Sequence, residues 1–93
     1  MVIPQDTGWQ QALARLRWAE DAGFDCVAVT DHFMPTSGDL DGPFHEGCTL
    51  LSALAAHSNR VRLVLLVAGN TYRNPVLLSK HAVTLQHVTG GRI

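Results

Sequence analysis

The sequence is poor in charge, and the charge it has is nearly balanced. Only 16% of its 93 residues are Asp, Glu, Lys or Arg, and the formal net charge at pH 7 is −1. Lys and Arg form no cluster, so nothing in the sequence favours a nucleic-acid partner. Hydrophobic residues make up 46% of the chain, which indicates a packed domain rather than a disordered segment.

Long hydrophobic runs and a cysteine framework are also missing. The longest apolar stretch, residues 63–69, is far shorter than the roughly 20 residues that a membrane-spanning helix needs. Cys26 and Cys48 are too few for a disulfide framework, and we expect both to be small buried side chains. The first residues lack the basic head and apolar core of a signal peptide, so we expect a cytoplasmic protein without a membrane partner.

The clearest positive pattern is a pair of short, nearly unbroken apolar runs, residues 26–29 and 61–68. Runs of this length are typical of strands that are buried on both faces of a parallel sheet. Residues 1–4 resemble the end of a further strand, and residues 92–93 resemble the start of another. The sequence therefore predicts several parallel strands rather than an isolated hairpin.

Three amphipathic segments alternate with these runs. Thr7 and Gln10 fit a capping box at the start of the first helix. The second helix is expected from about Cys48 to His57, and Asn74-Pro75 suits the cap and first position of the third. Such alternation predicts an α/β fold with parallel strands joined by right-handed crossovers. We expect the chain to be the N-terminal third of a larger protein.

Polar residues stand where the first strand is expected to end. Asp31 and His32 follow the run at 26–29, and α/β folds place their sites at the carboxyl ends of parallel strands. An imidazole transfers protons near neutral pH, and a neighbouring carboxylate tunes it. The alternative is structural, with Asp31 capping loop amides and His32 packed at the end of the strand.

A second polar segment, residues 69–75, follows the other strand and leads into a helix N-terminus. Its backbone amides and polar side chains suit an anionic or carbonyl-bearing ligand. The alternative is a helix cap beside a solvated Arg73. No glycine-rich phosphate loop follows either strand, which disfavours a Rossmann or P-loop protein.

A metal site is the weakest interpretation, and we expect none. His45 and Glu46 lack the second histidine of a metallopeptidase helix, because Thr49 stands at that position. Metal ligation from four side chains of one loop region stays open as an alternative: Asp31, His32, His45 and Glu46. A metal-dependent barrel hydrolase would use Asp31 and His32. The remaining histidines are expected on helices, remote from the loops at the carboxyl ends: His57, His81 and His87.

Five segments carry a pattern that covers nearly the whole chain in register. They are residues 19–25 (AEDAGFD), 29–33 (VTDHF), 46–56 (EGCTLLSALAA), 69–75 (GNTYRNP) and 90–93 (GGRI). Together they resemble the start of the bacterial-luciferase-like flavin and deazaflavin oxidoreductases. The resemblance implies a (β/α)8 TIM barrel, with residues 1–93 as a partial domain truncated before the fourth strand.

The resemblance also implies an activity, which is hydride transfer between coenzyme F420 and a small organic substrate. The alternative within the family is an FMN-dependent monooxygenase. His32 would be the catalytic proton donor or anion stabiliser, and Asp31 would contact the cofactor. A cofactor-supporting bulge with a non-prolyl cis peptide maps to about Leu65-Leu66, and Ala68 and Asn70 complete the implied cofactor contacts.

The sequence departs from the family pattern at several of these positions. Cys48 stands where relatives commonly have Trp, Val64-Leu65 replaces a Gly followed by a small residue, and Ala68 replaces a hydroxyl. Larger side chains at a barrel lip narrow the pocket, so the choice between F420 and FMN stays open. The later strands of the family are absent, so we expect this chain to be inactive alone. A homodimer is a possible assembly of the full-length enzyme.

Overall fold

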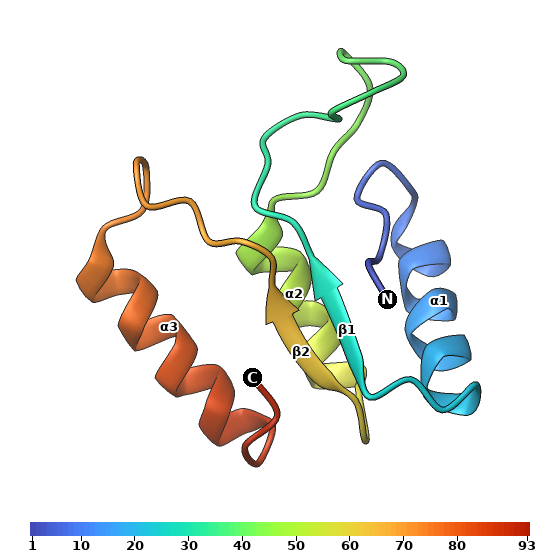
Figure 1. Cartoon of the computed structure of the whole chain (residues 1–93), viewed down its shortest axis with the longest axis vertical. Coiled ribbons are helices and arrows are strands. Elements are labelled where there is room, and N and C mark those ends of the chain that lie inside the picture. The colour runs from blue at the N-terminus through green and yellow to red at the C-terminus, as the bar shows by residue number, and fades with distance from the viewer.

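A computed structural model describes every residue from 1 to 93. Its elements follow the order α1 (Trp9–Asp21), β1 (Cys26–Val29), α2 (Gly47–His57), β2 (Arg62–Leu65) and α3 (Pro75–Val88). The two strands lie side by side, α2 lies behind them, and α1 and α3 flank the sheet (Figure 1). The expected α/β fold is confirmed, with the arrangement of the N-terminal part of a TIM barrel.

The strands β1 and β2 are parallel, and Val29 at the end of β1 pairs with Leu65 at the end of β2. Their carboxyl ends therefore open at the same edge of the sheet. This edge carries both polar segments that the sequence singled out, residues 30–33 and 69–74. Figure 1 shows the chain leaving both strands at this edge in long connections.

Both ends of the chain extend the sheet. The amide of Ile3 donates to the carbonyl of Ala28 at 2.8 Å, and Val2 forms a parallel bridge with Ala28. At the opposite side of the sheet, the amide of Leu63 donates to the carbonyl of Arg92 at 2.7 Å. The strand-like residues predicted at both termini thus lie beside β1 and β2.

The core lies between the sheet and the helices. Alternate strand residues, Val27, Val29 and Leu63, are fully buried and belong to one cluster with Leu16 of α1 and Leu54 of α2. Side chains alternate between the two faces of a strand, so these residues share one face. Burying each such side chain is worth about 1.5–3 kcal/mol relative to leaving it exposed.

The capping-box prediction for the first helix is wrong. The N-cap of α1 is Gly8, which has no side chain to offer, and the helix begins at Trp9. The hydroxyl of Thr7 donates instead to the carbonyl of Pro4 at 3.1 Å. Thr7 is therefore used in the turn that connects the first residues to α1, one residue too early to cap it.

The other helix starts agree more closely with the sequence patterns. The side chain of Asn74 accepts hydrogen bonds from the amides of Val76 and Leu77, with Pro75 in the first turn, as predicted. The strand expected over 61–68 is shorter, because β2 ends at Leu65. No helix of the chain combines the length and the apolar character needed to cross a membrane.

Candidate functional site

A buried ion pair connects the two strand ends. Asp31 lies two residues beyond β1, and only 2% of its side chain is exposed. Its Oδ2 atom accepts hydrogen bonds from the amide of Gly69 at 2.8 Å and from Nε of Arg73 at 2.5 Å, and Nη2 of Arg73 binds Oδ1. This two-point contact between a guanidinium and a carboxylate fixes orientation as well as distance.

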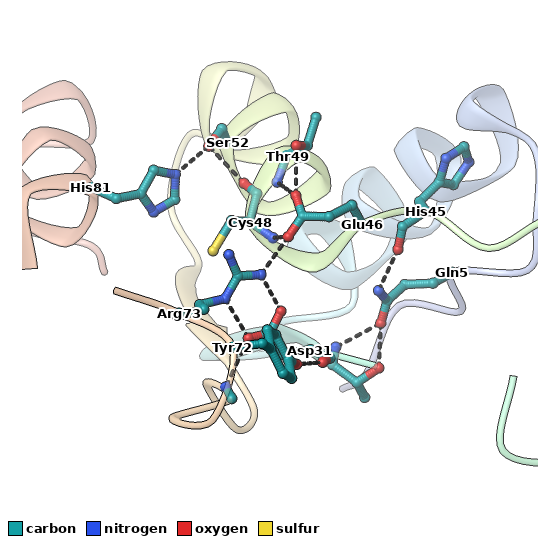
Figure 2. A network of polar contacts seen from close by, with 12 residues as sticks. Gln5, Asp31, His45, Glu46, Cys48, Thr49, Ser52, Tyr72, Arg73 and His81 are labelled. Carbon is teal, nitrogen blue, oxygen red and sulfur yellow. Dashed lines mark hydrogen bonds and ion pairs between the residues drawn. The ribbon is translucent and has the colours of Figure 1, made fainter. Parts of the chain in front are cut away.

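The same guanidinium reaches a third element. Nη2 of Arg73 also binds Oε1 of Glu46, which is the N-cap of α2. The Glu46 carboxylate accepts from the amides of Cys48 at 3.0 Å and Thr49 at 2.7 Å, so it satisfies donors that the helix leaves free. Figure 2 shows Arg73 between the two carboxylates, which joins the loops after β1 and β2 to the start of α2.

These contacts keep the groups in their charged forms. The hydrogen bond from Arg73 is the main cause that lowers the pKa of Asp31, against a smaller opposing effect of burial. Partial burial raises the pKa of Glu46, but hydrogen bonds from Thr49 and Arg73 and the α2 amides outweigh it and lower the pKa to about 2. The hydrogen bond to Asp31 raises the pKa of Arg73 further above its already high value.

A glycine allows α2 to approach the strand end this closely. A Cβ atom on Gly47 would lie 2.4 Å from the carbonyl oxygen of Thr30 and 3.0 Å from Oδ1 of Asp31. The first distance is shorter than any Cβ contact that a folded chain sustains, so a larger residue would push the helix away. The absence of a side chain at Gly47 therefore brings the Glu46 cap within reach of Arg73.

Asp31 and His32 are adjacent in the sequence, but the structure places their side chains in different surroundings. Asp31 is buried with Arg73, whereas His32 is exposed and lines a hollow beside residues 2–6 and 35–37. On that side Gln5 accepts from the amide of Thr30 at 2.7 Å and donates to the carbonyl of His45 at 2.7 Å. The structural alternative for Asp31, capping of a loop amide, is thus observed at Gly69.

The remaining cofactor candidates lie along the chain just beyond β2. Leu65 and Ala68 are half-buried, and Leu66 and Asn70 are exposed. A non-prolyl cis peptide bond is present in this segment, between Leu66 and Val67, one residue further than the resemblance implied. These residues follow the same strand end that the Asp31–Arg73 pair supports.

The sequence patterns did not identify every residue that the structure brings together around Asp31. Arg73 is not solvated, since its side chain is 19% exposed and binds Asp31 and Glu46. Glu46 could have been recognised as an acidic N-cap directly before the second helix. His81 was expected to lie remote from the strand-end loops, but it lines a cavity together with Tyr72 and Arg73.

Of the four side chains that kept a metal site open, the structure brings only Asp31 and Glu46 together. The ring of His45 contacts the carbonyl of Thr7 at 2.8 Å, and His32 lies on the other side of the chain from Asp31. A different group, Asp31, Glu46 and Cys48, has ligand atoms within 4.8 Å of one another. Arg73 already binds both of these carboxylates, so a cation there would have to displace the guanidinium.

With this geometry in place, the chain can be compared with known proteins. The luciferase-like monooxygenase family matches residues 2–93. The chain belongs to this family. One relative, the 4-hydroxyprotoasukamycin monooxygenase of Streptomyces nodosus subsp. asukaensis, is 28% identical over 75 residues, which make up 81% of this chain and 19% of the relative. The chain thus spans about a fifth of the length of the curated relative that it matches.

Proposed function

We propose that this chain forms the first β/α units of a luciferase-like oxidoreductase that passes a hydride between coenzyme F420 and a small organic substrate. The observation that carries the proposal is the common edge of the sheet, where the parallel β1 and β2 present His32 and Asn70. The sites of β/α barrels lie at this end of the strands. Membership of the luciferase-like monooxygenase family supports the oxidoreductase class.

The side chains at this edge suit a flat, mostly apolar ring system with a polar rim. Leu66, Val67 and Phe33 are 48%, 72% and 64% exposed, so they leave apolar surface open at this edge. The rings of Phe33 and Tyr72 lie 4.4 Å apart between centroids, so the two loops meet at one surface. We infer that this surface takes the ring of the coenzyme, which supplies the hydride chemistry when bound.

The residues of this chain then divide into two kinds of role. His32 is exposed beside a hollow and holds or delivers a proton at one of its ring nitrogens. Asn70 and the backbone of residues 65–68 bind and orient the ring. Asp31 acts as a positioning residue, because both of its carboxylate oxygens are already bonded to Arg73 and Gly69.

An FMN-dependent monooxygenase is the second candidate. It is favoured by the Streptomyces relative, which is a monooxygenase. Both candidates use the same edge of the sheet and the same residues. They differ in the coenzyme and in whether molecular oxygen is consumed.

Reconstitution with each coenzyme tests the proposal. The intact enzyme that carries this chain is loaded with reduced F420 or reduced FMN, and coenzyme oxidation and oxygen uptake are followed together. We expect substrate-dependent oxidation of F420 without stoichiometric oxygen uptake. Oxygen uptake with FMN would instead establish the monooxygenase, and turnover with neither coenzyme would contradict both. The 93-residue chain assayed alone is expected to show no turnover.

A further inference from the structure

A cavity of about 420 Å³ lies between α2 and α3, and it shares Tyr72 with the surface that the proposed function uses. Its walls include side chains from both helices and from the loop after β2: Cys48, Ser52, Tyr72, Arg73, Leu77 and His81. Figure 2 shows Ser52 and Cys48 on α2 facing His81 of α3, with Arg73 below them. Its volume falls within the range of small-molecule pockets, roughly 300–1,000 Å³.

Two polar groups on the walls of this cavity form no hydrogen bond within the chain, and Nη1 of Arg73 is open to the cavity rather than buried. Nη1 of Arg73 forms no hydrogen bond, because the contacts to Asp31 and Glu46 use only Nε and Nη2. Cys48 is buried, with 9% of the residue exposed, and its thiol is neither bonded to another cysteine nor hydrogen-bonded. Burial raises the pKa of Cys48, which keeps the thiol neutral. Figure 2 places the sulfur on the side of Nη1.

The opposite wall carries an oriented imidazole. Oγ of Ser52 has one proton, which it donates to the carbonyl of Cys48 at 2.7 Å. The contact of 2.9 Å between Oγ of Ser52 and Nε2 of His81 therefore has the imidazole as donor. Nδ1 of a neutral His81 is then left with a lone pair. The cavity thus combines a charged donor on one wall with an oriented ring on another.

The charges around the cavity select against ions. Asp31 and Glu46 together outweigh the single positive charge of Arg73, so an anion that approaches Nη1 also meets two carboxylates behind it. A cation meets the guanidinium first, which shields both carboxylates. A neutral molecule with a carbonyl oxygen satisfies Nη1 at no such cost, and Leu77 and Tyr72 cover its apolar part.

We propose that the α2–α3 cavity binds a small, neutral, largely apolar molecule through a carbonyl oxygen that accepts from Nη1 of Arg73. Such a molecule contacts the guanidinium that holds Asp31, and Asp31 in turn holds the amide of Gly69. Its binding therefore restrains the loop after β2. The proposal does not depend on the identity of the coenzyme, because its polar contact is made by Arg73, which the proposed coenzyme surface does not use.

Three planar probes of nearly equal shape test whether the cavity prefers a neutral ligand to an ion. Benzamide is neutral, benzoate is an anion and benzamidine is a cation. Each is titrated into the 93-residue chain, and binding is measured from the rise in the urea midpoint and from amide shifts in nitrogen-15 spectra. We expect benzamide to bind at least about tenfold more tightly than either ion, a difference of ~1.4 kcal/mol. Equal or tighter binding of benzoate would overturn the proposal, as would no binding of benzamide.

Two variants locate the site, and a third serves as the control. Cys48→Trp fills the cavity and is expected to abolish benzamide binding. Because this position is buried, Leu77→Gln provides a second variant at a side chain that is 70% exposed, with an expected loss of roughly threefold or more. Val83→Gln is the matched control on the same helix, since Val83 is also exposed but does not line the cavity. Equal losses in Leu77→Gln and Val83→Gln would show that benzamide binds elsewhere and would refute the proposal.

Discussion

Arg73 donates hydrogen bonds to both carboxylate oxygens of Asp31, although the two residues are 42 positions apart in the sequence. The contact brings together the loops that follow two parallel strands, and the Nη2 atom that binds Asp31 also binds Glu46 at the start of α2. A single guanidinium thus fixes three elements at the edge of the sheet where the candidate site lies.

Replacing Arg73 by Met is expected to destabilise the chain strongly. The methionine keeps an extended side chain but leaves the carboxylate of Asp31 buried without its partner, which costs about 3–5 kcal/mol. Urea unfolding followed by circular dichroism measures the loss. Arg17→Met is the control, because Arg17 is exposed and forms no hydrogen bond or ion pair, and should change stability by less than about 0.5 kcal/mol. Similar values for the two variants would remove Arg73 from its structural role.

Acid is expected to weaken the same network over a defined range of pH. The pKa of Glu46 is about 2 in the folded chain, below its ordinary value of 4.5. The unfolded chain therefore binds protons first, and the free energy of unfolding falls as the pH drops from about 4.5 toward 2. In Glu46→Gln this part of the pH dependence should disappear when urea unfolding is measured at intervals across that range.

Glu20 provides an independent comparison for the acid experiment. Burial raises the pKa of Glu20, but hydrogen bonds from the amides of residues 59–61 outweigh it, so the pKa is lowered overall. Glu20→Gln should remove a separate part of the pH dependence of the free energy of unfolding. The double variant with Glu20→Gln and Glu46→Gln should lose the sum of the two parts. A pH profile of Glu46→Gln that runs parallel to the wild-type profile would contradict the assignment.

Gly47→Ala is expected to disturb the packing of α2 against the end of β1. Its methyl group would meet the carbonyl of Thr30 at 2.4 Å, which forces the backbone to shift and costs about 1–3 kcal/mol. Gly8→Ala is the comparison, since a Cβ at Gly8 meets nothing within 4 Å and should cost less. The measurement is again the free energy of unfolding. A Gly47→Ala variant as stable as the wild type would show that α2 has room to move.

His32→Ala is expected to reduce turnover of the intact enzyme with little effect on folding. His32 is exposed, so its truncation should change stability by less than about 0.5 kcal/mol. Loss of a general acid or base lowers the rate by a factor on the order of 10² to 10⁴. Turnover and the thermal midpoint are measured side by side in both proteins. Unchanged turnover with an intact fold would remove His32 from the chemistry.

Local patterns were enough to predict much of the fold. The apolar run at 26–29 predicted β1 because a strand buried on both faces needs no alternation of polar residues. Asn74 was recognised as a cap because the cap acts within two or three residues. The same reasoning failed at Thr7, where a hydroxyl suited to capping lies one residue before the N-cap and bonds to the preceding turn.

The sequence by itself determined that strands and helices alternate, and that Asp31, His32 and residues 69–74 come at strand ends. Only the tertiary structure decided which of these side chains meet. Adjacent residues point to different sides of an extended chain, so Asp31 turned toward Arg73 and Glu46 while His32 turned toward the N-terminal segment. Contacts of this kind depend on the parallel register of β1 with β2 and on the room left by Gly47, and neither property belongs to any short stretch of sequence.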